Sequence, residues 1–340
     1  MTHLTRAQAR RRRFLAGAAG AALLSAVPAL APAPATAAPS FAPADTGARI
    51  VDQTWLDDRT FDVTIDTPSL AQRVKTRIIV PESWTPDAAR TWPVVYAYHG
   101  GRDSYVSWTR STDIERYAAP HDVMVVMPEA ANGAYTDWYN DGEGGPPMWE
   151  TFHTVEVLQL MERNFHAGTA RAAMGISSGA GGAMTYAGRR PGIFRYIAAS
   201  SGVMHTTMPG VPTMLVLTQA LYTETEDATD VWGVPGVHDA NWLAHDPWVL
   251  ARNLRGVGLF VSSGRTGLPG PHDRPAPGEE ESVQVQEVIC GRTTESFLRR
   301  LGRLGIPVTS HVYEDGWHNW EAWRPEMDRY WAPMMRAIGA

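Results

Sequence analysis

Three separated stretches of the chain carry the side chains that an acyl-transfer reaction would need. The first contains Gly175-x-Ser177-x-Gly179, a serine between two glycines. This pattern is typical of a sharp turn from a strand into a helix, with the serine at the apex and no room for a Cβ at either glycine. The alternative is a plain Gly/Ser-rich loop, so the pattern needs a histidine, an acid and oxyanion donors elsewhere.

The second stretch surrounds His318, within Asp-Gly-Trp-His-Asn-Trp at residues 315–320. It follows the last expected strand, where a loop would return a histidine to the carboxyl edge of a sheet. Histidine suits general-base catalysis because its pKa lies near neutral pH. The alternative is a surface histidine held among tryptophans. We expect His318 to be the base that activates Ser177.

The acid that orients such a histidine should lie between the serine and the histidine in the chain. The residues alone leave this choice open. The run at 279–281 is most simply a solvated loop, and Glu287 stands at the start of an amphipathic segment. The candidates are Asp246, Glu279, Glu280, Glu281, Glu287 and Glu295.

The third stretch, His99-Gly100-Gly101-Arg102, follows an expected buried strand and looks like the HGG motif of esterases. An oxyanion hole needs two backbone N–H groups aimed at the developing negative charge. We expect these donors to be Gly101 and Ser178, the residue after the nucleophile. Arg102 could orient an acyl or sugar oxygen, or simply pair with Asp103.

Strands alternate with helices from residue 47 onward, which predicts one α/β domain over residues 47–340. The expected fold is an α/β-hydrolase fold, a mostly parallel central sheet with helices on both faces. Residues 203–250 should form a helical excursion over the cleft, and residues 265–281, with four prolines, an exposed loop. Helices are expected at 149–164 and 180–188, and strands at 49–54, 60–65, 74–80, 92–99, 122–128, 169–174, 196–200, 258–263 and 308–313.

The charge of the chain excludes some partners. Five of its 30 basic residues and none of its 36 acidic residues lie in residues 1–37, so the remainder carries 25 basic against 36 acidic residues, a net charge of −11. This argues against nucleic acid or an anionic membrane surface as a partner. Cys290 is the only cysteine, so no internal disulfide can form.

Residues 1–37 are predicted to be an export signal. Arg10 to Arg13 form a charged region, an apolar run follows, and Ala35-Thr36-Ala37 is an A-x-A cleavage site. The run Arg-Arg-Arg-Phe-Leu at 11–15 resembles the twin-arginine export motif. The alternative is a membrane anchor, but Pro28 breaks the apolar run and no later segment is long enough to span a bilayer. We expect a secreted protein, extracellular or associated with the cell wall.

The chain resembles the esterase D group, and most closely the antigen 85 mycolyltransferases. The segments that carry the resemblance are residues 135–139, 149–152, 175–179, 230–233 and 245–247, and the histidine motif at His318, Trp320 and Trp323. In that family the catalytic glutamate lies ten residues before a phenylalanine. Glu287 lies ten residues before Phe297, so the resemblance selects Glu287 as the acid.

The resemblance also implies which residues contact the substrate, with departures. His99 stands where the family has a sugar-binding aspartate, Gly101 replaces a leucine and Ser178 a methionine, while Arg102 matches a kept arginine. Losing the aspartate weakens the case for trehalose as acceptor. We expect substrate contacts from His99, Arg102, Trp320 and Trp323.

The expected function is that of a serine carboxylesterase or acyltransferase. Ser177, Glu287 and His318 would form an acyl-enzyme from a small-molecule or lipid ester and pass the acyl group to water, glycerol or a sugar. Such chemistry needs no metal or organic cofactor. One alternative is a trehalose O-mycolyltransferase or diacylglycerol acyltransferase of the antigen 85 type. Another is a non-catalytic carbohydrate- or matrix-binding relative, and a peptidase is a third that no peptide-binding pattern supports.

Overall fold

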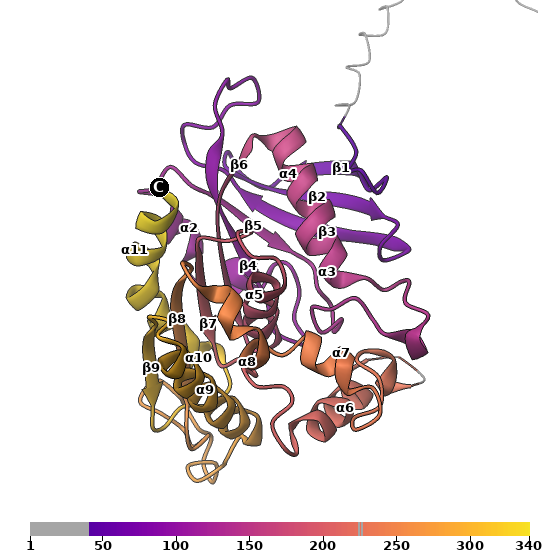
Figure 1. Cartoon of the computed structure of the whole chain (residues 1–340). Helices are drawn as coiled ribbons and strands as arrows, with labels where there is room; N and C mark the ends of the chain where they lie inside the picture. The colour runs from indigo at the N-terminus through magenta and orange to yellow at the C-terminus, as the bar shows by residue number, and fades with distance from the viewer. Residues whose placement is uncertain (1–40, 224, 226) are drawn as a thin grey trace, which may run out of the picture. The chain divides into compact units, whose positions relative to one another are not determined.

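A computed structural model of the chain describes residues 41–223, 225 and 227–340 (Figure 1). The export signal expected at residues 1–37 and its Ala35–Ala37 cleavage site lie outside the described residues. Within the described part, nine strands form one sheet in the order β1-β2-β3-β5-β4-β6-β7-β8-β9. Their bounds are β1 (Arg49–Trp55), β2 (Thr60–Thr67), β3 (Gln72–Ile79), β4 (Trp92–Tyr98), β5 (Met124–Pro128), β6 (Ala167–Ile176), β7 (Tyr196–Ser200), β8 (Gly258–Gly264) and β9 (Thr309–Tyr313).

The strands β4, β6, β7, β8 and β9 run parallel to their neighbours, and β1, β2 and β3 pair antiparallel at one edge. Strand β5 joins the two parts, since it is parallel to β4 and antiparallel to β3. The expectation of a mostly parallel sheet is confirmed. Because the carboxyl ends of parallel strands meet at one edge, the loops after β4, β6, β8 and β9 gather there. These loops contain Ser177, His318 and the segment from His99 to Arg102, while Glu287 lies in the first turn of the helix that follows the loop after β8.

Side chains that alternate along the strands build two apolar cores, one on each face of the sheet. In β4, Tyr96 and Tyr98 belong to one core and Val95 and Ala97 to the other. The first core includes side chains of α4 (Val157–Phe165), α5 (Ser178–Arg189) and α9 (Val285–Leu304). The second includes those of α1 (Ser107–Ser111), α2 (Ile114–Ala118), α10 (Trp320–Trp323) and α11 (Met327–Ile338).

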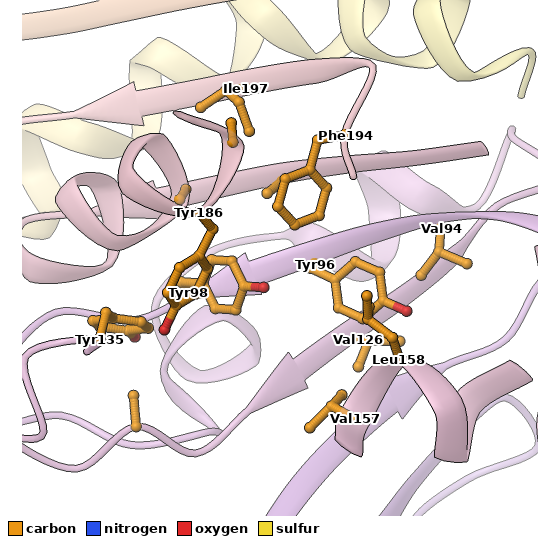
Figure 2. Close-up of a cluster of buried hydrophobic side chains, with 14 of the residues drawn as sticks. Val94, Tyr96, Tyr98, Val126, Tyr135, Val157, Leu158, Tyr186, Phe194 and Ile197 are labelled. Atoms are coloured by element: carbon orange, nitrogen blue, oxygen red, sulfur yellow. The ribbon is translucent and has the colours of Figure 1, made fainter. Parts of the chain in front are cut away.

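Three tyrosines support the end of β4 and the helix that follows β6. Figure 2 shows Tyr98, Tyr135 and Tyr186 gathered at one end of the first core, with Tyr96 further along the same strand. The Tyr98 ring centroid lies 5.7 Å from that of Tyr186 and 5.5 Å from that of Tyr135, both edge to face. Edge-to-face contacts of this kind stabilise aromatic clusters beyond simple area burial. The cluster therefore holds α5 against the end of β4.

The helix expected at residues 149–164 is divided by a wider turn. It consists of α3 (Trp149–Thr151), a π-helical turn η2 (Phe152–Glu156) and α4. Within the π turn, the buried Glu156 carboxylate accepts hydrogen bonds from the side chains of Thr46, Thr67 and Ser69. The wider turn shifts the buried face, so Val155 is partly exposed although the regular helical spacing predicts burial.

The helical excursion lies between β7 and β8 in the chain, as expected, and includes α6 (Val211–Tyr222), η3 (Ala228–Asp230), α7 (Asp239–Ala244), α8 (Pro247–Leu250) and η4 (Ala251–Leu254). Helix α6 is apolar, but Val211 is its one buried residue, while Leu217 is 60% and Leu221 80% exposed. Within the described ranges, no helix combines the length and apolarity needed to cross a membrane.

Candidate active site

Ser177 lies at the apex of the turn between β6 and α5. Its backbone has φ 52° and ψ −123°, a conformation that non-glycine residues rarely adopt. The two glycines are required by close backbone approach. A Cβ added to Gly175 would lie 2.4 Å from the carbonyl carbon of Gly179, and one added to Gly179 would lie 2.5 Å from the His99 carbonyl oxygen. The residue pattern thus forms the strained strand–turn–helix that it predicts.

The structure brings Ser177, His318 and Glu287 into one hydrogen-bonded chain. Nε2 of His318 lies 2.8 Å from Oγ of Ser177, and Nδ1 lies 2.6 Å from Oε2 of Glu287. His318 lies in the loop between β9 and α10, and Trp323 packs edge to face against its ring, with centroids 5.0 Å apart. Because the carboxylate only accepts, Nδ1 carries the proton and Nε2 faces the serine hydroxyl as an acceptor. This is the tautomer that a general base needs.

Glu287 is completely buried and all its hydrogen bonds are supplied by neighbours. Its Oε1 accepts from the amide of Gly264 at 2.6 Å, from Oγ of Ser201 at 2.7 Å and from Oγ of Ser263 at 3.0 Å. The residue also lies in the first turn of α9, where the helix dipole favours a negative charge. These contacts compensate for burial of the charge and fix the carboxylate toward His318.

The other acidic candidates are engaged elsewhere. Buried Asp246 accepts hydrogen bonds from Thr207 and caps the start of α8. Glu295 pairs with Arg265 near the surface. Residues 279–281 are exposed in the loop that precedes α9. Of the six carboxylates considered, the structure places Glu287 against His318.

Gly101 and Ser178 lie side by side at the edge of the turn. A Cβ added to Gly101 would lie 3.9 Å from Oγ of Ser178, and one added to Gly100 would lie 3.3 Å from Cβ of Ser177. Neither the Gly101 nor the Ser178 N–H donates a hydrogen bond to another of the described residues. Two free amides beside the serine are the arrangement that an oxyanion hole requires.

Ser177 opens into a cavity of about 330 Å³ beneath α6. Its lining includes Gly181, Thr185 and Val203, together with Met214 and Leu215 of α6. Polar side chains gather near Tyr222, whose hydroxyl accepts a hydrogen bond from Gln286 and whose ring lies 5.3 Å from the Arg102 guanidinium. Arg102 is the one Asp, Glu, Lys or Arg side chain among the described residues that line the cavity.

The four residues expected to contact substrate are not all placed at the cavity. Arg102 and Trp323 line it, whereas Trp320 packs edge to face on Trp108 with centroids 5.0 Å apart. His99 is 1% exposed and turns toward Glu129 instead. The ring points this way because the carbonyl of Gly100 and the carboxylate of Glu129 both bind it. His99 and Trp320 are therefore not among the residues that line the cavity, and their expected substrate contacts stay predictions.

Some residues at the site have no signal in the sequence. Asp273, in the loop expected to be merely exposed, accepts hydrogen bonds from the Trp317 amide at 2.8 Å and the Asn319 side chain at 2.7 Å, on either side of His318. Gln284 binds the His318 amide at 2.8 Å. These contacts join residues more than thirty positions apart in the sequence, so they become visible only in the folded structure. A serine directly after a buried strand could have indicated Ser201, which follows β7.

Cys290 has its sulfur within 4.8 Å of ligand atoms of Glu287 and His318. Burial, followed by the charge of Glu287, raises the pKa of the thiol well above its ordinary value. A metal ligand would have to be the thiolate, and the ion would compete with the hydrogen bond between Glu287 and His318. We therefore assign no metal to this cluster.

The fold and the geometry around Ser177 place the protein among the α/β hydrolases. Comparison with protein families identifies the group: residues 67–332 match the family described as "Putative esterase", and the chain belongs to this esterase family.

Two mycobacterial proteins are among the relatives of this chain. An esterase of Mycobacterium tuberculosis (Rv1288) is 27% identical over 292 residues, which is 83% of this chain and 60% of that protein. This chain therefore spans less than two thirds of that relative. The diacylglycerol acyltransferase/mycolyltransferase Ag85A of Mycobacterium tuberculosis is 27% identical over 261 residues, 73% of this chain and 74% of Ag85A. The resemblance to the antigen 85 group is confirmed.

Solved structures support the fold. MPT51 (FbpC1) of Mycobacterium tuberculosis has a TM-score of 0.63 at 21% identity, covering 80% of this chain and 96% of MPT51. An S-formylglutathione hydrolase of Agrobacterium tumefaciens has a TM-score of 0.65 at 16% identity, covering 85% of this chain and 99% of the hydrolase. At these identities the match shows the α/β-hydrolase fold alone.

Proposed function

We propose that the protein is a serine esterase or acyltransferase that works through an acyl-enzyme on Ser177. The observation that carries the proposal is the hydrogen-bonded chain from Glu287 through His318 to Ser177, at the mouth of a cavity. Membership of the esterase family and the similarity to an esterase and to Ag85A support it.

The geometry supports the following steps. Oγ of Ser177 attacks the ester carbonyl carbon while Nε2 of His318 takes the hydroxyl proton. Glu287 holds Nδ1–H and stabilises the charged imidazole that forms. The N–H groups of Gly101 and Ser178 bind the tetrahedral oxyanion.

The tetrahedral intermediate collapses when the bond to the alcohol oxygen breaks and His318 returns the proton to that oxygen. An ester between the acyl group and Ser177 remains. Water or a second alcohol, deprotonated by His318, then attacks this ester, and Ser177 leaves with the proton.

The cavity favours an acyl chain of moderate length. Its volume of about 330 Å³ lies at the lower end of the roughly 300–1,000 Å³ typical of small-ligand pockets. The walls are apolar around Met214 and Leu215, and polar around Arg102 and Gln286. We therefore place the acyl chain beneath α6 and the alcohol or acceptor near Arg102.

The test uses the protein without residues 1–37 and p-nitrophenyl acetate, octanoate and palmitate, each with and without trehalose or glycerol. Mass analysis of the products separates hydrolysis from transfer. We expect octanoate to be turned over faster than palmitate. Efficient acylation of trehalose would show that the activity is of the mycolyltransferase type and not plain ester hydrolysis. Absence of any turnover would favour the non-catalytic binding alternative.

We further propose that the protein is exported and that residues 1–37 are removed. The Ala35-Thr36-Ala37 site and the short apolar run before it support this. N-terminal sequencing of protein from the culture medium should begin near Ala38. Intact chain recovered from membranes would instead indicate an anchor.

A further inference from the structure

The loop that carries Gly100 and Gly101 is held by residues that follow β5. The hydroxyl of Tyr135 donates to the His99 carbonyl at 2.7 Å, and the Arg102 amide donates to Oδ1 of Asn132 at 2.7 Å. Between these two anchors lies the peptide group formed by the Gly100 carbonyl and the Gly101 amide. Its orientation decides where the Gly101 N–H points.

The side chain of His99 holds this peptide group. Its Nδ1 donates a hydrogen bond to the Gly100 carbonyl oxygen, 2.7 Å away. A trans peptide is planar, so its C=O and N–H point in opposite directions. When His99 binds the carbonyl on the buried side, the Gly101 N–H must point to the other side, and Gly101 lines the cavity beside Ser177.

We propose that His99 is a positioning residue for the oxyanion hole, and that Glu129 holds its ring in place. The inference rests on the proposed function, because it concerns the donor that would bind the oxyanion. It gives His99 a part in the reaction without contact to substrate. It also explains why His99, which is 1% exposed, turns away from the cavity although the next two residues, Gly100 and Gly101, line it.

Glu129 is built to hold the ring. Its Oε1 lies 3.1 Å from Nε2 of His99 and accepts from the Ala131 amide at 2.8 Å. Burial raises the pKa of the Glu129 carboxyl, but hydrogen bonds from His99 and two backbone amides together with the charge of His99 outweigh burial, so the pKa is lowered overall. The amide of Ala130 also lies 2.9 Å from Nε2. Because the Gly100 carbonyl can only accept a hydrogen bond, Nδ1 of His99 carries a proton.

Two substitutions separate positioning from packing. In His99→Asn, the side-chain amide nitrogen occupies the place of Nδ1 and can still donate to Gly100, whereas the contact with Glu129 is lost. In His99→Gln, the amide lies further out, near the place of Nε2, and the bond to Gly100 is lost while the contact with Glu129 is kept. Both are uncharged and similar in size, so each serves as the control for the other.

The experiment measures kcat and KM for p-nitrophenyl octanoate, inhibition by a phenylboronic acid and the melting temperature of each variant. The boronate adduct on serine is tetrahedral and places an oxygen in the oxyanion hole. We expect His99→Gln to lower kcat about 10²-fold with little change in KM, since loss of one oxyanion donor typically costs about 10²–10³-fold. Boronate affinity should fall in parallel. His99→Asn should retain most of both.

Equal loss in the two variants, in step with equal loss of melting temperature, would show that the histidine merely packs and would overturn the inference. Unchanged kcat in His99→Gln would also overturn it. If the wild type shows no turnover, the proposed function itself is contradicted. If the wild type is active but the two variants lose equal activity, or His99→Gln keeps its kcat, only the inference about His99 is contradicted.

Discussion

Replacing Glu287 by glutamine should leave His318 in the wrong tautomer. One oxygen of Glu287 faces the Gly264 amide at 2.6 Å, and this donor cannot rotate. The glutamine must therefore place its carbonyl oxygen there and turn its NH₂ group toward Nδ1 of His318. That NH₂ group donates, so Nδ1 must accept and the ring proton must move to Nε2. Nε2 can then no longer take the proton of Ser177.

The expected loss of kcat is large because the new glutamine amide cannot turn its oxygen toward His318 without placing its NH₂ group against the Gly264 N–H. A base held in the wrong tautomer loses about 10⁴-fold in kcat in the best-studied serine enzymes, about 5.5 kcal/mol of transition-state stabilisation. The substitution preserves size and three of the hydrogen bonds to the carboxylate. We therefore expect Glu287→Gln to lower kcat about 10²- to 10⁴-fold, nearer the upper value, with KM little changed.

The assay follows hydrolysis of p-nitrophenyl octanoate and the melting temperature, with two controls. Glu295→Gln changes an acid that pairs with Arg265 at the surface. The triple change of residues 279–281 to glutamine alters exposed loop carboxylates. Both controls should retain near wild-type kcat. If either control is inactive and Glu287→Gln is active, Glu287 is not the acid.

Two further substitutions test the cavity and the histidine loop. A Cβ at Gly181 would meet only the Val203 carbonyl within 4 Å, at 3.6 Å, so a larger side chain fits there and would narrow the cavity. We expect Gly181→Val to lower the octanoate-to-acetate ratio of kcat/KM by about tenfold or more. An unchanged ratio would show that the acyl chain binds elsewhere. Asp273→Ala removes the acceptor for the residues on either side of His318 and should lower kcat about tenfold, since hydrogen bonds to charged groups contribute about 1.5–3 kcal/mol each. Glu279→Ala, in the same loop, is the control for that kcat measurement, and equal rates in the two variants would show that Asp273 does not position His318.

Local rules predict the sheet and the turn well. The alternation of strands and helices, and the steric need for Gly175 and Gly179, depend on neighbours in the chain. Ser177 and His318 follow from the same rules, because each lies in the turn or loop that follows a predicted strand. The choice of Glu287 among six carboxylates needed the family resemblance, since its approach to His318 depends on how α9 packs against β8.

Side-chain direction at the strand ends could not be predicted. His99 follows β4, and its ring could face the cavity or the core. The structure turns it inward because Glu129, after β5, binds it from a neighbouring loop. Asp273 appears in the sequence as one acid in a proline-rich loop, and its two contacts with the histidine loop come from residues more than forty positions away.

Covalent trapping of the acyl-enzyme tests the central claim most directly. The protein without residues 1–37 is treated with a fluorophosphonate, and separately with p-nitrophenyl octanoate followed by acid quench, and each adduct is located by peptide mass spectrometry. We predict one adduct, on Ser177, that is absent in Ser177→Ala and forms much more slowly in His318→Ala. An adduct on another residue, or full esterase activity in Ser177→Ala, would contradict the assignment of Ser177 as the nucleophile.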